Sequence, residues 1–358
     1  MAQAAWVKKS KISDVALVDV GLPALGDGAV RLRVESFAVT ANNVTYAAIG
    51  DMFGYWNFFP ADGDNGIVPM WGHASVEASH CPEIAVGERL YGYLPMATHL
   101  DVIPGTVTPG QFSDTSDHRQ PMSPFYNIYS RLGSDPEHDP SREAARMIFG
   151  PLFKTGFLIE AMCRREGWYG AGQVVMTSAS SKTALALAHC VKESSPEIRR
   201  VGLTSARNAS FVQSSGLFDE IVSYDAINEV SVSPSVVVDF AGNSAVLRAV
   251  HGALGDSLKY SCLVGATHIE ARGNGKEEPL PGPQPILFFA PDHATATVKE
   301  LGPKGFGQAV AQSWGSFVRA TDGYVTVDER GGLQAAADAF LSTVKGEADP
   351  AVGIVVRP

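Results

Sequence analysis

The fold of this chain is decided by residues 173–188, which read QVVMTSASSKTALALA. Residues 174–176 form a short apolar run, as in a buried strand. A polar turn follows, and after it come residues with high helix propensity. The small residues Ala184, Ala186 and Ala188 would let such a helix approach a sheet closely. The stretch therefore predicts a strand, a tight turn and a closely packed helix.

The alternation of strand and helix continues along the chain. We predict strands at 173–177, 200–204, 220–224, 235–240 and 258–264, and helices at 182–192, 208–215 and 245–253. Strands that alternate with helices form parallel sheets with right-handed crossovers. We therefore expect an α/β fold that contains a doubly wound parallel sheet.

The first third of the chain has a different character. Residues 30–36 alternate apolar and polar side chains, as a half-buried strand does, among many glycines and prolines. Residues 98–141 read as a long irregular excursion, a kind of segment that is usually functional or mobile. Helices are predicted at 141–147 and 154–166. We therefore expect a β-rich region before the sheet domain.

The tail after Pro291 contains two predicted helices, 292–302 and 305–320, and then a strand, a helix and a last strand. Such a tail is expected to return to the β-rich region and complete it. We therefore predict a discontinuous β-rich domain of residues 1–145 and 300–358 around a sheet domain of residues 146–299.

The composition excludes several classes of function. Of 358 residues, 28 are Lys or Arg and 38 are Asp or Glu, a formal net charge of −10. This balance disfavours a general binder of nucleic acid or anionic membranes. No apolar run approaches the roughly 18 residues of a membrane helix, and the N-terminus lacks the apolar core of a signal peptide. We therefore expect a cytoplasmic protein with reduced, widely spaced cysteines.

The turn after the first strand of the sheet domain is rich in hydroxyl groups. The candidates for phosphate binding at this turn are Ser178, Ser180, Ser181, Lys182 and Thr183. Backbone N–H groups and the helix dipole attract phosphate at such a junction. The alternative is an ordinary helix capped by serine. The glycine fingerprint of dinucleotide enzymes and the glycines of a Walker A loop are both absent.

The end of the next strand carries Ser205, Arg207 and Asn208 and no acidic residue. In a doubly wound cofactor domain this position contacts the adenosine ribose, where NAD enzymes use a carboxylate and NADP enzymes use arginine. If a dinucleotide binds here, the segment favours NADP(H). The alternative is a solvated helix start with Ser205 or Asn208 as its cap.

Several motifs resemble one superfamily in the same order along the chain. Residues 38–50 resemble G-V-N-x-x-D-x-x-x-x-x-G, residues 87–92 resemble G-D-R-V-x-G, and residues 237–242 resemble V-x-D-x-x-G. The chain thus resembles the zinc-independent medium-chain dehydrogenases/reductases, on the side of the quinone and enoyl reductases. Through residues 40–46 and 50–56 it is most similar to the DUF2855 group.

The resemblance implies a GroES-like catalytic domain, a Rossmann-type cofactor domain, bound NADP(H), a small-molecule substrate and a homodimer. It adds Tyr224, Gly242 and Gly265 to the cofactor-binding residues. Gly72-His73-Ala74 is similar to the G-H-E of the zinc enzymes, but the expected cysteine is missing and the glutamate is Ala74. No metal is therefore expected, and His73 is predicted to be structural.

Without a metal, an O–H or N–H donor must stabilise charge on the acceptor oxygen. Tyr46 matches a tyrosine of the quinone reductases, and Asn42 is the second candidate, each with a structural role as its alternative. Asp51, Tyr55 and Trp56 are predicted to line the substrate cleft as part of its wall or a lid, with a subunit contact as the alternative.

The sequence thus predicts an NADPH-dependent reductase of an enone, enoyl thioester or quinone. A regulator or sensor that binds NADP(H) without turnover, and a structural protein on a reductase fold, are the alternatives.

Overall fold

The computed structural model describes residues 2–264 and 279–358. The chain forms two compact units, which are Met1–Ile148 with Val327–Pro358, and Phe149–Thr326. Residues 300–326 were expected in the β-rich domain, but they group with the sheet unit. The reason is packing, because Phe317 stacks on Phe153 with ring centroids 5.3 Å apart and Ser316 Oγ lies 2.8 Å from His189 Nε2.

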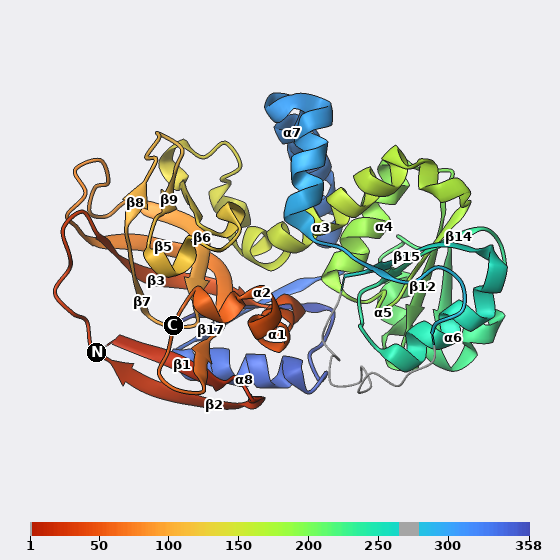
Figure 1. The fold of residues 1–358 in the computed structure, drawn as a ribbon, viewed down its shortest axis with the longest axis horizontal. Helices are drawn as coiled ribbons and strands as arrows, with labels where there is room; N and C mark the ends of the chain where they lie inside the picture. The colour runs from red at the N-terminus through yellow and green to blue at the C-terminus, as the bar shows by residue number, and fades with distance from the viewer. Residues whose placement is uncertain (1, 265–278) are drawn as a thin grey trace. The chain divides into compact units, whose positions relative to one another are not determined.

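The second unit is built on a six-stranded sheet with the order β13-β12-β11-β14-β15-β16 (Figure 1). The strands are β11 (Gln173–Met176), β12 (Arg199–Thr204), β13 (Glu220–Ser223), β14 (Ser235–Asp239), β15 (Leu258–Leu263) and β16 (Ile286–Leu287). The helices after β11, β12 and β14 are α4 (Lys182–Ser194), α5 (Ala209–Ser214) and α6 (Ser244–Leu254). Each neighbouring pair of strands is parallel. The predicted doubly wound parallel sheet is confirmed.

The close packing predicted for the first helix of this sheet is also present. The side chains of α4 from Ala184 to Val191 are all buried. At Gly156 of α3 (Glu143–Arg165), an added Cβ would lie 2.6 Å from the Leu187 backbone nitrogen. Only a residue without a side chain permits this approach of the two helices.

Helix α3 corrects the prediction of two separate helices at 141–147 and 154–166. It runs without a break through Pro151. Proline costs one backbone hydrogen bond inside a helix, but Phe149, Leu152 and Phe153 on either side are buried. Their burial stabilises the continuous helix. The break predicted near residue 302 does exist, because Gly302 leaves helical geometry at φ 71° inside α7 (Ala290–Thr321).

The first unit contains a nine-stranded sheet, ordered β17-β18-β3-β5-β6-β10-β9-β8 with β7 paired to β3, and a three-stranded sheet, β2-β1-β4. Their bounds are β1 (Ala2–Lys8), β2 (Lys11–Val20), β3 (Val30–Val39), β4 (Asn65–Ile67), β5 (Pro69–Ser79), β6 (Arg89–Pro95), β7 (His99–Val102), β8 (Pro104–Gly105), β9 (Gln111–Asp114), β10 (Ile128–Arg131), β17 (Thr326–Gly331) and β18 (Val352–Arg357). Helices α1 (Ala41–Ala48), α2 (Gly50–Phe53) and α8 (Leu333–Val344) complete this unit. The tail returns to the first region as predicted, because β18 pairs with β3.

The excursion at 98–141 is more regular than predicted, since it supplies β7 to β10.

A buried ion pair anchors the segment 98–141. Arg119, which is 0% exposed, places Nη1 3.0 Å from Asp114 Oδ2 and also donates to the Tyr129 hydroxyl at 3.0 Å. Its guanidinium lies 4.9 Å from the centroid of the Phe59 ring. Pairing and hydrogen bonding are what make a buried charge tolerable, so the excursion is tied to the aromatic residues beside it.

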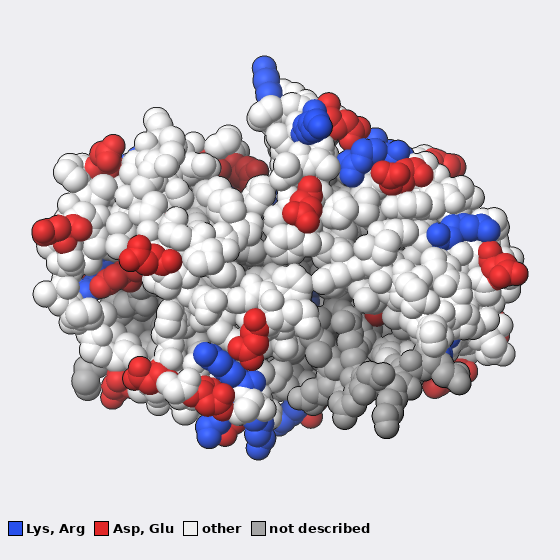
Figure 2. Space-filling view, in the orientation of Figure 1, with Lys and Arg blue, Asp and Glu red and all other residues white. Residues whose placement is uncertain are grey.

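The charged side chains of the visible face are interspersed. Figure 2 shows Lys and Arg next to Asp and Glu on that face, without one continuous basic patch. Among the residues described, no helix combines the length and apolarity that crossing a membrane requires.

Candidate functional site

In the first unit, helix α1 is fixed to the sheet by a buried asparagine. Asn43 accepts a hydrogen bond from the Thr40 backbone nitrogen (2.6 Å) and donates one to the Pro69 backbone oxygen (2.8 Å). The first bond holds the start of the helix, and the second attaches it to β5. Asn43 therefore has a structural role, which leaves its neighbour Asn42 directed elsewhere.

Asn42 and Tyr46 lie one helical turn apart and contact each other. The Tyr46 hydroxyl oxygen accepts from Asn42 Nδ2 at 2.6 Å and from Trp71 Nε1 at 3.1 Å. An indole N–H can only donate. Two N–H donors therefore hold the phenol oxygen in place, and the Tyr93 hydroxyl interacts with it as well. The structure thus brings both predicted catalytic residues together and adds Trp71.

Tyr46 belongs to an aromatic group that we call the tyrosine cluster: Tyr46, Tyr55, Trp71, Tyr93 and Tyr126. The Tyr46 ring lies 4.6 Å from that of Tyr55 and 5.4 Å from that of Tyr93. The hydroxyls of Tyr55 and Tyr126 are 3.1 Å apart. The Tyr93 hydroxyl is buried and interacts with the Tyr46 hydroxyl. The cluster therefore combines apolar ring faces with hydroxyl groups.

Burial keeps these phenols protonated. Desolvation raises the pKa of Tyr46 well above its ordinary value of 10, and the proximity of Tyr126 raises it further. Burial raises the pKa of Tyr55 and of Tyr93 in the same direction. A phenol in this state donates a hydrogen bond at neutral pH and cannot act as a general base.

The three residues predicted for a substrate cleft have separate places in the structure. Asp51 is exposed in α2, and Tyr55 is buried in the tyrosine cluster. Trp56 is 3% exposed and packs against Gly50 and Gly66, where an added Cβ would come within 2.3 Å of the indole. Trp56 therefore belongs to the hydrophobic core, and its assignment to a cleft wall is corrected.

His73 of β5 is fully buried, and neither ring nitrogen has a hydrogen-bond partner in the described residues. Burial lowers the pKa of His73 to about 4, so the imidazole is neutral at neutral pH. Across residues 2–264 and 279–358, no three His, Cys, Asp or Glu side chains gather as metal ligands do.

In the second unit, the polar turn after β11 is held by side chains from distant segments. The Ser178 backbone N–H, at a left-handed φ of 49°, donates to the Tyr224 hydroxyl at 2.7 Å. Asn208 Nδ2 donates to Ser180 Oγ at 3.1 Å. Four of the predicted cofactor residues are thus brought together by the fold.

Ser181 acts as a helix cap, which was the structural alternative to phosphate binding. Its hydroxyl accepts a hydrogen bond from the Ala184 backbone nitrogen at 3.2 Å, at the start of α4. Lys182 and Thr183 are half-buried in the first turn of that helix. Ser205 and the exposed Arg207 lie at a short 3-10 helix, Ala206–Asn208, directly after β12. The predicted phosphate and ribose residues therefore occupy the carboxyl ends of neighbouring strands.

Asp239, at the end of β14, organises the same end of the sheet. It is 0% exposed and accepts from Thr177 Oγ1 at 2.5 Å and from the Gly242 backbone nitrogen at 3.1 Å. It also lines a pocket of about 290 Å³ together with Gly242 and Arg248. Gly265 lies outside the described residues.

The sequence was compared with protein-family models. A model described as "Protein of unknown function (DUF2855)" matches residues 37–349. The chain belongs to the DUF2855 family. No curated protein matches the sequence.

The solved structures similar to this DUF2855 chain include proteins described as oxidoreductases and quinone reductases. CurA from Vibrio vulnificus has a TM-score of 0.63 at 15% identity, covering 100% of this chain and 98% of CurA. A putative NADPH:quinone reductase from Mesorhizobium loti has a TM-score of 0.62 at 13% identity, covering 100% and 98%. A quinone oxidoreductase from Pseudomonas syringae has a TM-score of 0.59 at 14% identity, covering 100% of both chains. These likenesses confirm the predicted fold of a GroES-like domain and a Rossmann domain.

Three residues that lie in these candidate sites of the DUF2855 chain were not predicted from the sequence. Trp71 and Tyr93 are neighbours in the tyrosine cluster because Trp71 pairs with Tyr93 across β5 and β6. The alternation of aromatic residues in 91–93 was the available signal, but it could not specify the partner strand. Asp239 was part of a recognised motif, and its strand-end position before a glycine could have marked it.

Proposed function

We propose that this protein is an NADP(H)-dependent oxidoreductase that transfers a hydride to a carbonyl-conjugated substrate without a metal. Enones, enoyl thioesters and quinones form the substrate class. The observation that supports this most directly is the Tyr46 hydroxyl, which Asn42 and Trp71 hold in place. Its O–H group would donate to a substrate oxygen.

Tyr46 would act by stabilising negative charge. When the conjugated carbon accepts a hydride, the carbonyl oxygen gains charge, and a hydrogen bond from a fixed donor lowers the energy of that state. Asn42 and Trp71 orient the phenol, and their N–H donors polarise it toward donation. The ring faces of Tyr55 and Tyr126 offer an apolar surface for a planar, conjugated acceptor.

The polar turn of the second unit fits a dinucleotide diphosphate. Ser180, Lys182 and Thr183 would hold the phosphates at the start of α4, and the bound cofactor would supply the hydride. Arg207 and Ser205, without an acid beside them in sequence, would take the 2′-phosphate of NADP(H). Among the similar structures, CurA is solved in complex with NADPH and an oxidoreductase from Salmonella enterica in complex with NADP.

A direct test is to titrate the full chain with NADPH and with NADH by fluorescence. Oxidation of the bound cofactor is then followed with 2-cyclohexenone, crotonyl-CoA and 1,4-benzoquinone. The proposal expects NADPH to bind more tightly than NADH and at least one acceptor to be reduced. Failure of both nucleotides to bind would leave the third possibility, a structural protein on a reductase fold.

One observation favours a regulator or sensor as the second candidate. The turn is already closed by its own contacts, Ser178 to Tyr224 and Asn208 to Ser180. A turn built to signal cofactor binding could open these contacts without any chemistry following. NADPH binding with no oxidation by any acceptor of the panel would select this function over the reductase.

We also place the protein in the cytoplasm as a homodimer. All four cysteines are free. Strand β16 lies at the edge of the six-stranded sheet in the described part of the chain and exposes Ile286 (56%) and Leu287 (42%). Exposed apolar edges favour pairing with another chain. Light scattering should therefore give a dimer that Ile286→Lys converts to a monomer, while Val232→Lys, at another exposed apolar position, leaves it intact.

A further inference from the structure

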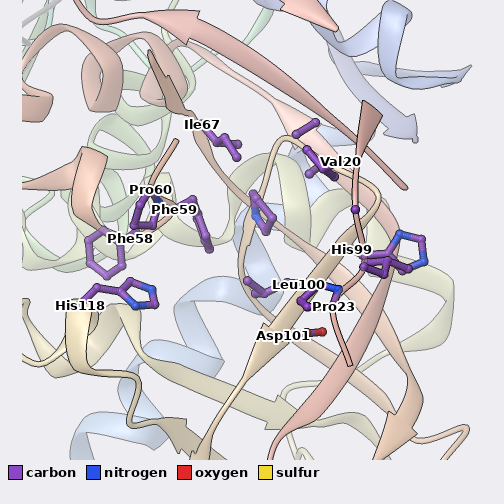
Figure 3. Close-up of a pocket in the computed structure, with 15 residues that line it drawn as sticks. Val20, Pro23, Phe58, Phe59, Pro60, Ile67, His99, Leu100, Asp101 and His118 are labelled. Atoms are coloured by element: carbon purple, nitrogen blue, oxygen red, sulfur yellow. The ribbon is translucent and has the colours of Figure 1, made fainter. Parts of the chain in front are cut away.

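A second pocket, of about 280 Å³, lies in the first unit, and Tyr46 is not among its lining residues. It is formed by the end of β2, the segment before β4, the end of β6, strand β7 and the 3-10 helix Asp117–Arg119 (Figure 3). We propose that this pocket binds a small, uncharged aromatic molecule that carries a hydroxyl group, such as a phenol.

The walls of the pocket are flat and apolar. Phe58 is 0% exposed and Phe59 is 4% exposed, and in Figure 3 both lie with Pro60 on one side of the pocket, opposite Pro23 and Leu100. Aromatic and proline rings offer flat surfaces to a planar ligand. Because the volume is at the small end of ligand sites, which span about 300–1,000 Å³, one or two fused rings would fill it.

The charged groups at the pocket are already paired. Asp101 accepts from Arg31 Nε at 2.8 Å and from Arg31 Nη2 at 2.7 Å, and the same Nη2 also donates to the Pro23 carbonyl oxygen. His99 lies 2.8 Å from Thr98 Oγ1 and 3.4 Å from Glu77. A charged ligand would lose its hydration on entering the pocket, and it would find no opposite charge there that is not already paired. The pocket therefore selects an uncharged molecule.

His118 supplies the polar contact. Its ring lies near Phe58 in Figure 3, and burial, together with the neighbouring Arg119, lowers the pKa of His118. The neutral imidazole has one donor and one acceptor nitrogen. In the proposal, a ligand hydroxyl donates to the acceptor nitrogen of this ring.

The pocket shares a wall with the tyrosine cluster. Phe58 lies 5.0 Å from Tyr93 and 6.3 Å from Tyr55, measured between ring centroids. A ligand on the pocket side of Phe58 would contact the residue that supports these tyrosines, but it would leave the Tyr46 hydroxyl untouched. This separation allows the two sites to be tested independently.

The test is calorimetric titration of the full chain with 2-naphthol, naphthalene and 2-naphthoate. The expected result is saturable binding of 2-naphthol, roughly tenfold weaker binding of naphthalene for the loss of one hydrogen bond, and no binding of 2-naphthoate. His118→Phe keeps an apolar wall and should make 2-naphthol and naphthalene bind alike.

Leu22 lies at the rim and is 44% exposed, so Leu22→Trp can fill the pocket without disturbing the core. It should weaken 2-naphthol binding at least tenfold, whereas Val86→Trp, at an exposed position outside the pocket, should not change it. Absence of 2-naphthol binding, equal binding of 2-naphthoate, or no effect of Leu22→Trp would each overturn the proposal. Loss of binding in Tyr46→Phe alone would place the ligand in the tyrosine cluster and overturn it as well.

Discussion

The tyrosine cluster of the first unit and the polar turn of the second use hydrogen bonds in different ways. In the cluster, two N–H donors converge on the Tyr46 oxygen, which also interacts with the buried Tyr93 hydroxyl. In the turn, Ser178 is bonded to Tyr224 and Ser180 to Asn208.

Under the proposed function, this difference would separate a catalytic group from a binding surface. A reacting molecule would contact the Tyr46 O–H group, whose oxygen is already held by two donors. A turn whose polar groups satisfy one another is stable alone, but a phosphate must displace those contacts to bind. The first region should therefore affect turnover and the second should affect cofactor affinity.

The largest expected effect comes from removing the hydrogen of Tyr46. Tyr46→Phe keeps the ring in the cluster but removes the donor, so kcat should fall by about 100- to 1,000-fold, with NADPH affinity unchanged. Stopped-flow oxidation of NADPH with the best acceptor measures this. Tyr126→Phe is the matched control, because Tyr126 bonds to Tyr55 and not to Tyr46, and it should retain most of the activity. Equal turnover of Tyr46→Phe and wild type would remove Tyr46 from the mechanism.

The next effect concerns the stability of the first unit. His73 has a pKa of about 4 in the folded state because of burial, against about 6.5 when unfolded. The unfolded chain therefore binds more protons below pH 6.5, and stability is lost as the pH falls from 6.5 toward 4. The loss amounts to about 2–3 kcal/mol between pH 7.5 and 4.5.

Urea unfolding of wild type and of His73→Phe at these two pH values measures the contribution of His73. On acidification, the free energy of unfolding of the variant should fall by about 2–3 kcal/mol less than that of the wild type. An identical pH dependence of both proteins would show that His73 does not titrate as a buried neutral group.

In the second unit, the strongest effect is expected at the end of β12. Arg207→Ala should weaken NADPH binding by about 10- to 100-fold, the value of one charge-assisted hydrogen bond, and leave NADH binding unchanged. Fluorescence titration with both nucleotides gives the ratio of the NADPH and NADH dissociation constants. Arg199→Ala, at the other end of the same strand, is the control and should change neither affinity. Equal weakening of NADPH and NADH would contradict the 2′-phosphate assignment.

The smallest expected effect tests whether the hydrogen bonds within the polar turn weaken the binding of NADPH. Tyr224→Phe removes the acceptor of the Ser178 N–H and should leave that group for a phosphate oxygen. NADPH should then bind about 2- to 10-fold more tightly, the net value of a neutral hydrogen bond. Weaker binding in the same titration would mean that Tyr224 contacts the cofactor directly, and the contrast between the two regions would disappear.

The sheet unit was well predicted because its pattern is local. Each strand is a short apolar run, each helix begins at a polar turn, and the parallel order follows from the crossover rule. The junction at Ser178–Ser181 was predicted for the same reason. Helix α3 was predicted as two helices, and Pro151 between them is indeed a local signal for a break. The burial of Phe149 and Phe153 overrides that signal and depends on partners far away in the sequence.

The candidate site was predicted only in part. Tyr46 and Asn42 were predicted from the resemblance of residues 38–50 to a family motif, and the structure places them in contact. Trp71 was missed because its contact with Tyr46 depends on how α1 packs against β5, and no local sequence pattern specifies that packing. Trp56 was misplaced because a run of consecutive aromatic residues does not reveal which ring is buried. In the structure, the Trp56 ring packs against glycines, where any side chain would clash with it.

The sequence by itself determined the parallel sheet, the return of the tail to the first region and the residue types of both candidate regions, because periodicity and motif order act over short distances. Only the tertiary structure decided that Asn42 and Trp71 both donate to the Tyr46 oxygen, that Tyr224 and Asn208 close the polar turn, and that α7 packs with the sheet unit. Each of these depends on contacts between residues tens of positions apart, and such contacts are set by how the elements pack.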